Sequence, residues 1–304
     1  MKKTIFIQIT CYQDNELVKT IQDAVEKSSD ENHLIFGVHA IHYDDDTSWI
    51  DPIRKVHNIK IFESKAPQNI GMGVGRFFAH QFYRGEDYYF QIDAHSRFDQ
   101  DWDKFLIEEI ERHKANGFKK PVITQYPKPY WYEGDEEKTN THEEVVTQFY
   151  WKDPHRFDLY RTPMQGTIKN PEGNIHSISV SGGCIFVEGK LLDPNQSVFA
   201  DGEEIVMAAR LYTHGYDLFV PSKMFMYHLY FGNKGKNWRR TVYQDFPDET
   251  IRLEKISKEE IWIVLSGEGT TGEHRLGTER TLAEYGQFAG LDFKNGKVLD
   301  NYTA

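Results

Sequence analysis

The first half of the chain alternates between short apolar runs and segments with helical spacing. Strand-like runs occur at Thr4–Thr10, Leu34–Ile41, Ile59–Glu63, Tyr88–Ile92 and Val122–Thr124. Between them, apolar residues recur every three or four positions in Glu16–Ser28, Met72–Tyr83 and Trp102–Asn116. Strands that alternate with helices usually build a parallel sheet that is covered by helices on both faces. The pattern therefore predicts an α/β fold with a mainly parallel central sheet.

The alternation weakens after Pro127. The segment Pro127–Asn140 combines prolines, aromatic residues and an acidic polar run, which favours a long surface loop. Farther on, the pattern predicts helices at Glu203–His214, Leu253–Leu265 and Thr278–Phe288. No shift in composition marks a domain boundary. We expect one α/β domain over residues 1–250 and a helical C-terminal extension over residues 251–304, packed on that domain.

Charge and cysteine content exclude several classes of protein. The 304 residues include 36 lysines and arginines against 47 aspartates and glutamates, so the net charge is −11. Such acidity argues against a broad nucleic-acid-binding face. No stretch approaches the roughly 18 apolar residues of a membrane span. The run Thr4–Thr10 is too short and too polar for a signal peptide core. With only two cysteines, we expect a cytoplasmic protein in a reducing compartment.

The strand Tyr88–Ile92 runs directly into Asp93-Ala94-His95. Ligands bind beyond the carboxyl ends of parallel strands, and an aspartate and a histidine two residues apart can face one side there. A carboxylate oxygen and an imidazole nitrogen would then be available to one cation. The alternative is that Asp93 caps a turn and that His95 is an ordinary surface histidine.

Two further segments carry titratable groups that admit two interpretations. Asp201, Glu203 and Glu204 crowd the start of a predicted helix, where the helix dipole alone favours acids. They can also face a bound polyol or a reacting hydroxyl group. His228 lies between aromatic residues, where a histidine is more often a hydrogen-bonded packing residue than a metal ligand.

Read together, these segments resemble retaining nucleotide-sugar glycosyltransferases of the GT-A fold. The sequence is most similar to the protein-hydroxyproline N-acetylglucosaminyltransferases and their bacterial relatives, and more distantly to the polypeptide N-acetylgalactosaminyltransferases. The similarity spans nearly the whole chain. It rests on QIDAHSRFDQDWD (Gln91–Asp103), ISVSGGCIF (Ile178–Phe186), the set FADGEEI, RLYTHGYDLFVP and YHLYF within Phe199–Phe231, and LGTERTLAEYGQFAGLDF (Leu276–Phe293).

The resemblance implies a metal site. Asp93 and His95 match the D-x-H motif for metal and diphosphate, and His228 matches the later histidine that supplies a third protein ligand. Such a mixed site suits Mn²⁺ or Mg²⁺. A divalent cation offsets the negative charge that develops on a departing UDP. The chain departs from the pattern at Ala94, where serine is common, so a contact from this position to the ribose is in doubt.

The resemblance also implies a binding site for the nucleotide sugar. Thr10 and Tyr12 match the position that holds uracil and ribose, although Tyr12 is equally compatible with packing in the core. Arg76 follows the glycine-rich stretch Gly71–Gly75, whose backbone amides would approach phosphate. Ser181-Gly182-Gly183 resembles the turn that lines the sugar pocket, and its alternative is a simple hairpin turn.

The remaining implied residues concern the sugar and the acceptor. Asp201, Glu203 and Glu204 match the acidic segment near the sugar hydroxyls, with Glu203 and Glu204 favoured. Trp238 and the aromatic residues Tyr130–Tyr132 would stack on an acceptor or pack in the core. Arg239 and the neighbouring Arg240 would reach UDP phosphates from a loop that closes over the donor.

The resemblance thus implies a metal-dependent retaining transferase. It would move a sugar, N-acetylglucosamine from UDP-GlcNAc being favoured, to a hydroxyl group of a protein or a glycan. A metal-dependent hydrolase is an alternative, although no H-E-x-x-H motif is present. A non-catalytic module that binds sugar or protein on the same fold is another. The identity of the acceptor and the oligomeric state stay open.

Overall fold

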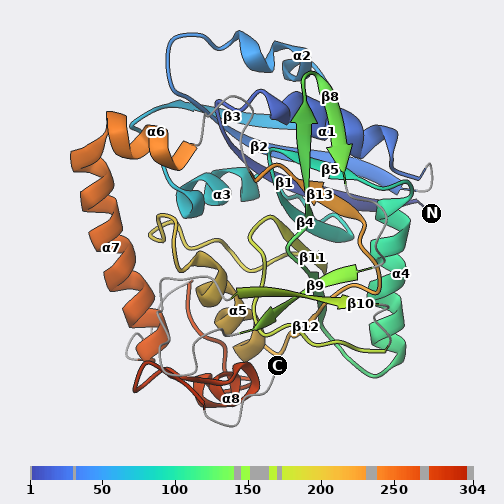
Figure 1. The fold of residues 1–304 in the computed structure, drawn as a ribbon, viewed down its shortest axis with the longest axis vertical. Coiled ribbons are helices and arrows are strands. Elements are labelled where there is room, and N and C mark those ends of the chain that lie inside the picture. Colours follow the sequence, from blue (N-terminus) through green and yellow to red (C-terminus); the bar gives the residue numbers. More distant parts are fainter. Residues whose placement is uncertain are drawn as a thin grey trace.

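The structure, a computed structural model, describes residues 2–29, 32–139, 145–150, 164–169, 173–230, 238–267 and 274–299. The alternation predicted for the first half is confirmed (Figure 1). Its elements are β1 (Lys3–Tyr12), α1 (Glu16–Glu26), β2 (Asn32–His42), η1 (Ser48–Ile50), α2 (Asp51–Arg54), β3 (Ile59–Lys65), α3 (Met72–His80), β4 (Tyr88–Asp93), β5 (Ser96–Phe98), α4 (Trp102–Ala115) and β6 (Pro121–Thr124).

In the second half, the described residues form short strands and four helices. They are β7 (Lys128–Glu133), β8 (Glu136–Thr139), β9 (Val145–Tyr150), β10 (Met164–Lys169), β11 (Cys184–Glu188), α5 (Glu203–Thr213), β12 (Asp217–Phe219), β13 (Met226–His228), α6 (Trp238–Asp245), α7 (Pro247–Ser266), α8 (Leu282–Ala289), β14 (Leu291–Asp292) and β15 (Lys297–Val298). Among the described residues, no helix has the length and the apolar character needed to cross a membrane.

The central sheet has seven strands in the order β12-β6-β11-β4-β1-β2-β3. All neighbouring pairs are parallel except those of β11, which runs antiparallel to β4 and β6. The prediction of a mainly parallel sheet in an α/β fold is therefore confirmed. Because β11 runs in reverse, its first residues lie at the edge where the parallel strands end.

Each strand sends alternate side chains into one of two cores, as the pleat requires. On one face, Ile7 and Phe90 pack with α1, α2 and α4. On the other face, Phe6 and Tyr89 pack with α5, α7 and α8. Both faces of the sheet are thus buried, and the polar chemistry is left to the ends of the strands.

A smaller sheet, in the order β5-β13-β7-β8, contains most of the segment that we predicted as a long loop. The loop prediction for Pro127–Asn140 is wrong, because β7 and β8 form an antiparallel hairpin. Tyr130 is buried while Trp131 is exposed, which is the alternation of a strand with one buried face. Gly134 supplies the left-handed turn residue, with φ +67°.

Helix boundaries in the last third differ from the predictions for local reasons. α7 begins earlier than expected, with Pro247 in its first turn, where a missing backbone N–H costs little. α8 begins later, because Thr281 and Glu284 form a capping box. The segment from Trp238 is the helix α6, so the loop expected there is wrong. The division of the chain at residue 250 stays a prediction.

Candidate active site

The candidate site lies at the edge where the parallel strands of the central sheet end. Thr10 of β1 pairs with Asp93 of β4, and Cys184 of β11 pairs with Ile92. This register places the first strand, the D-x-H motif and the turn Ser181–Gly183 side by side. A pocket of about 900 Å³ opens there, lined by residues of all three segments.

The smaller sheet brings the two histidines together. His228, the last residue of β13, pairs with Ser96 of β5, and the backbone N–H of Leu229 donates to the carbonyl of His95 at 3.1 Å. The rings of His95 and His228 lie edge to face with centroids 4.4 Å apart. Pairing between β5 and β13, rather than sequence proximity, creates this arrangement.

Asp93, His95 and His228 can together hold a metal ion, since one ligand atom of each lies within 4.8 Å of the others. The Asp93 carboxylate Oδ2 lies 3.1 Å from His228 Nε2. Burial alone would raise the pKa of Asp93, but His228, Arg76 and His95 outweigh it and hold this pKa well below its ordinary value. Burial and His95 lower the pKa of His228, which favours the neutral imidazole that binds metals.

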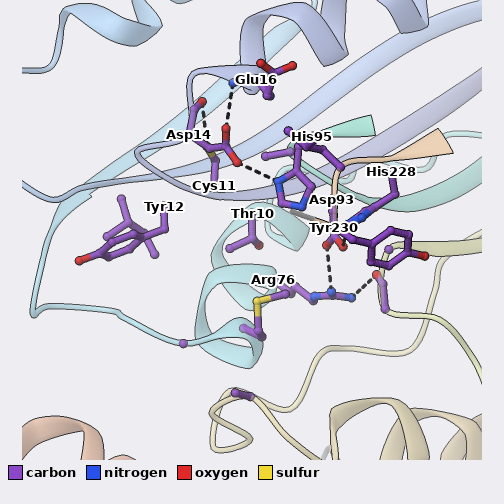
Figure 2. A pocket seen from close by; sticks show the side chains of 18 of the residues that line it. Thr10, Cys11, Tyr12, Asp14, Glu16, Arg76, Asp93, His95, His228 and Tyr230 are labelled. Carbon is purple, nitrogen blue, oxygen red and sulfur yellow. Dashed lines mark hydrogen bonds and ion pairs between the residues drawn. The ribbon is translucent and has the colours of Figure 1, made fainter. Parts of the chain in front are cut away.

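The three side chains fit Mn²⁺ or Mg²⁺ if the protein supplies some of the coordinating atoms and a bound ligand supplies the others. One carboxylate and two imidazoles leave coordination positions that water or phosphate oxygens can fill. His228 also has a buried Nδ1 with no hydrogen-bond partner among the described residues. The three side chains sit next to one another at the pocket wall, which is the placement that a metal-bound ligand requires (Figure 2).

His95 has a second partner that the sequence did not point to. Its Nδ1 lies 2.8 Å from Oδ2 of Asp14, which follows β1 at the same edge of the sheet. Burial lowers the pKa of His95, but the hydrogen bond and the charge of Asp14 outweigh burial and raise it. The available signal was the position of Asp14 two residues beyond a parallel strand.

Arg76 lines the pocket, and its side chain is almost fully buried. Its guanidinium donates to the Gly182 carbonyl at 2.6 Å, contacts Asp93 Oδ1 at 3.5 Å and pairs with Glu203 Oε1 at 3.0 Å. Figure 2 shows Arg76 beneath Asp93, joined to it by a dashed line. A guanidinium held by several partners is rigid, so its charge is fixed beside the metal ligands.

The glycine-rich stretch before Arg76 does not form the expected phosphate cradle. Helix α3 begins at Met72, so only Gly71, with φ +120°, acts as a turn residue. The amides of Met72 and Gly73 donate to the carbonyls of Phe199 and Val198. Glycine is needed at position 73 because a Cβ there would lie 2.2 Å from the Asn195 carbonyl oxygen. Close packing, not phosphate binding, accounts for these glycines.

The turn Ser181–Gly183 presses against the site from the side of β11. The backbone N–H of Gly182 donates a hydrogen bond to Glu204 Oε1 at 2.8 Å, and its carbonyl oxygen accepts one from Gln91 Nε2 at 2.9 Å. A Cβ on Gly183 would lie 2.6 Å from Asp93 Oδ2. The glycines therefore allow the backbone to lie beside the carboxylate that would bind metal.

We predict that Gly183→Ala weakens the binding of UDP in the presence of Mn²⁺ by about tenfold or more. The added methyl group must displace Asp93, and overpacking of this kind costs about 1–3 kcal/mol. Isothermal titration calorimetry measures the affinity. Gly189→Ala, at the other end of β11, is the control: φ +70° strains alanine there, but nothing lies within 4 Å. It should lose stability and keep its UDP affinity, and equal affinities for wild type and Gly183→Ala would contradict the prediction.

The three acids at the start of α5 have different environments. Glu203 pairs with Arg76, and burial raises its pKa to about 7, with the Glu204 and Asp93 carboxylates adding to the effect. Glu204 accepts hydrogen bonds from Gly182 and from the Tyr126 hydroxyl. Asp201 lines the pocket from an exposed position. Glu203 and Glu204 thus organise the groups around Asp93.

Thr10 and Tyr12 also line the pocket, as do Gln244 and Asp245 of α6. Thr10 Oγ1 and the Tyr12 hydroxyl are buried without a hydrogen-bond partner among the described residues. Such groups can serve a ligand with polar edges. α6 was not predicted, so its contribution to the pocket was missed.

Some of the predicted aromatic and basic residues do not line this pocket, and the side chains of others are not among those that the structure describes. Helix α6 begins at Trp238, but the side chains of Trp238, Arg239 and Arg240 lie outside the described part of the chain. Tyr130 is buried, with the Arg97 guanidinium 4.8 Å from its ring centroid. Of the two interpretations given for Tyr130, packing in the core therefore fits better than stacking on an acceptor.

Comparisons with known proteins concern the fold and the family of the chain. No curated protein sequence matches the chain significantly. The crystal structure of GalNAc-T7 with UDP, GalNAc and Mn²⁺ is similar in fold, with a TM-score of 0.55 and 13% identity over 96% of this chain. The chain spans 55% of that GalNAc-T7 chain. S. aureus TarS 1–349 in complex with UDP-GlcNAc has a TM-score of 0.51 and 13% identity, covering 95% of this chain and 71% of the TarS chain.

A family profile identifies the chain more directly. The profile of the family described as Glycosyltransferase (GlcNAc) matches residues 50–295, which include Asp93, His95, Arg76 and His228. The similar structures add the fold, which is that of GT-A glycosyltransferases. The chain therefore belongs to the Glycosyltransferase (GlcNAc) family and has the GT-A fold.

Proposed function

We propose that this glycosyltransferase moves N-acetylglucosamine from UDP-GlcNAc to a hydroxyl group of a protein or a glycan, with a divalent metal ion and with retention of configuration. The observation that carries the proposal is the cluster Asp93, His95 and His228 beside Arg76 in one pocket. With a divalent ion bound, such a cluster and Arg76 would offset the charge of a diphosphate locally, although the chain as a whole has a charge of −11.

Asp93, His95 and His228 would hold Mn²⁺ or Mg²⁺. Such an ion supplies Lewis-acid stabilisation of negative charge on the diphosphate leaving group. The solved structures support this choice, since that of GalNAc-T7 contains UDP, GalNAc and Mn²⁺ and that of TarS contains UDP-GlcNAc. Thr10 and Tyr12, which line the same pocket, are proposed to hold the nucleoside.

The chain's own residues would position the donor and stabilise charge. Arg76 adds a fixed positive charge close to the metal ligands. The turn Ser181–Gly183, which also lines the pocket, would let the sugar approach the backbone. Glu203 and Glu204 are engaged by Arg76 and by Gly182. Their engagement supports a retaining scheme in which neither acts as nucleophile and a departing phosphate oxygen takes the acceptor proton.

The test is whether UDP binding requires a divalent ion. With UDP at about 100 times its Kd, binding adds about 2.7 kcal/mol, which raises the Tm by about 5 °C. Differential scanning fluorimetry with Mn²⁺, with Mg²⁺ and with EDTA should show this rise only when an ion is present. An equal rise in EDTA would refute the metal-dependent scheme.

Donor identity needs a second readout. Release of UDP should be measured for UDP-GlcNAc, UDP-GalNAc and UDP-glucose in the presence of Mn²⁺, and UDP-GlcNAc is expected to be turned over fastest. Ligand binding without any release of UDP would favour a non-catalytic binding module. Hydrolysis of substrates that contain no nucleotide would favour a hydrolase. A cytoplasmic location stays a prediction, based on two cysteines that are buried and free.

A further inference from the structure

The contact between Asp14 and His95 places a carboxylate behind a ligand of the proposed metal site. Asp14 Oδ2 lies 2.8 Å from His95 Nδ1, and their side chains are 31% and 24% exposed. Figure 2 shows His95 between Asp14 on one side and Asp93 with His228 on the other. The residues are 81 positions apart, so the fold alone brings them together.

The chemistry of this contact determines which ring nitrogen can bind a metal. A neutral imidazole has one N–H and one lone pair, and a carboxylate accepts but does not donate a hydrogen bond. Asp14 therefore holds the proton on Nδ1 and leaves the lone pair on Nε2. Histidines that bind metals commonly donate their second N–H to a carboxylate in this way.

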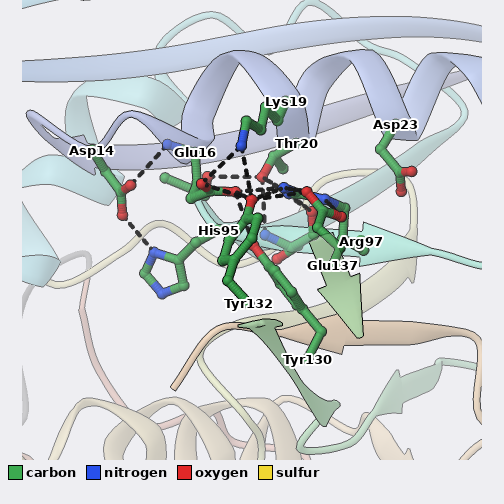
Figure 3. A network of polar contacts seen from close by, with 12 residues as sticks. Asp14, Glu16, Lys19, Thr20, Asp23, His95, Arg97, Tyr130, Tyr132 and Glu137 are labelled. Carbon is green, nitrogen blue, oxygen red and sulfur yellow. Dashed lines mark hydrogen bonds and ion pairs between the residues drawn. The ribbon is translucent and has the colours of Figure 1, made fainter. Parts of the chain in front are cut away.

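Asp14 is itself held from two directions. Its Oδ1 accepts a hydrogen bond from the backbone N–H of Glu16 at 2.9 Å, while its Oδ2 is hydrogen-bonded to His95. The Glu16 side chain is in turn bound by Arg97 and by the hydroxyls of Tyr130 and Tyr132, at 3.1 and 2.9 Å (Figure 3). This network joins the start of α1 to β5 and to the β7–β8 hairpin. The Asp14 carboxylate consequently has little freedom to turn away from His95.

We propose that Asp14 is a positioning residue that sets the tautomer and the orientation of His95 for metal binding. The inference rests on the proposed metal-dependent function. It adds Asp14, a residue of the loop between β1 and α1 that lines the same pocket and is hydrogen-bonded to His95. Its effect passes entirely through the His95 ring.

Asp14→Asn is a sharp test because the amide can fit in only one orientation. The N–H of Glu16 needs an acceptor, so the amide oxygen must take the place of Oδ1. The amide NH₂ then points at His95 Nδ1 and makes it an acceptor. The ring proton must move to Nε2, the nitrogen that would bind the ion. An equivalent change of carboxylate to amide beside a catalytic histidine is known to impose the wrong tautomer.

Two measurements separate this role from a merely structural one. Two-bond ¹H–¹⁵N correlation spectra of the metal-free protein at about pH 9, where imidazole is neutral, report the tautomer of His95. Electron paramagnetic resonance of free Mn²⁺ in the presence of UDP reports the metal affinity. We expect the Nδ1–H form in wild type, the Nε2–H form in Asp14→Asn, and Mn²⁺ affinity about 10–100-fold lower in the variant.

Asp23→Asn is the matched control. Asp23 is a residue of α1, and its Oδ2 accepts the backbone N–H of Phe98 in β5 at 2.7 Å. This contact involves none of the three proposed metal ligands. It should keep both the tautomer and the Mn²⁺ affinity. Asp14→Glu retains a carboxylate and should keep the Nδ1–H form. If Asp14→Asn does not fold, Asp14→Ala is used, and its His95 should relax to a mixture of tautomers.

The outcomes distinguish this inference from the function on which it rests. An Nδ1–H tautomer in Asp14→Asn, or in Asp14→Ala where that replaces it, would overturn the role of Asp14. So would wild-type Mn²⁺ affinity in either variant. If wild type itself fails to bind Mn²⁺, the metal-dependent function is overturned, and the tautomer measurement still decides whether Asp14 orients His95.

Discussion

Asp93→Asn is expected to lower the release of UDP from UDP-GlcNAc by about 10³-fold, because it removes the one carboxylate of the proposed metal cluster. Metal stabilisation of a leaving group amounts to several kcal/mol, and each 1.36 kcal/mol is a factor of ten in rate. The change also removes a negative charge that Arg76 and His228 both contact. The rate should be measured with saturating Mn²⁺, by detection of released UDP.

Asp87→Asn is the matched control for this prediction. Asp87 immediately precedes β4, at the end away from the pocket, and accepts the backbone N–H of Thr4 at 2.8 Å. Its neutralisation should leave the rate of UDP release unchanged. Circular dichroism verifies that both variants fold. A folded Asp93→Asn protein with wild-type hydrolysis and transfer would refute the assignment of Asp93 to the metal.

Arg97→Met is expected to lower the free energy of unfolding by about 3–5 kcal/mol, the range for removal of one partner of a buried ion pair. Arg97 is buried and pairs with the carboxylates of Glu16 and Glu137, the latter at 2.7 Å. These acids and its contact with Tyr130 raise the pKa of Arg97 against the opposing effect of burial. Methionine fills much of the volume but removes the guanidinium from the buried Glu16, which keeps only the weaker contact with Lys19 at 3.5 Å and the hydroxyls of Tyr130 and Tyr132. Urea denaturation measures the change.

Arg54→Met tests whether the loss is specific to a buried pair. Arg54 pairs with Asp51 and Glu63 at the surface, where ion pairs contribute about 1 kcal/mol or less. The two variants remove the same charge, so any difference reflects burial. Their free energies of unfolding, measured by urea denaturation, should differ by several kcal/mol. Equal losses would show that the network in Figure 3 contributes no more than a surface pair.

Local patterns predicted the main elements of the fold well. The strands that carry Thr10 and Asp93, and the helices α1 and α4, were identified from their periodicity, because a strand buried on both faces is a continuous apolar run. The errors occurred where short strands depend on a partner. The β7–β8 hairpin reads as loop because Pro127, Pro129 and an acidic run obscure the alternation of a half-buried strand.

The candidate site was predictable only in part, for a related reason. Asp93 and His95 are two residues apart and lie at the end of a recognisable strand, so their common environment follows from local geometry. Family resemblance indicated His228, but its contact with Asp93 joins residues 135 positions apart through the pairing of β13 with β5. Asp14 had no motif at all, and only the approach of two distant loops brings it to His95.

The amino-acid sequence by itself determined that the chain folds as an α/β protein with chemistry at the ends of its strands, since periodicity and strand-end residues are local properties. The folded chain alone established which polar groups meet. In the folded chain, Arg76 pairs with Glu203 and Asp14 is hydrogen-bonded to His95. The glycines of α3 lie where a Cβ would clash with neighbouring segments. These outcomes depend on strand order and register, which arise from burial of both faces of the sheet and cannot be read from any single segment.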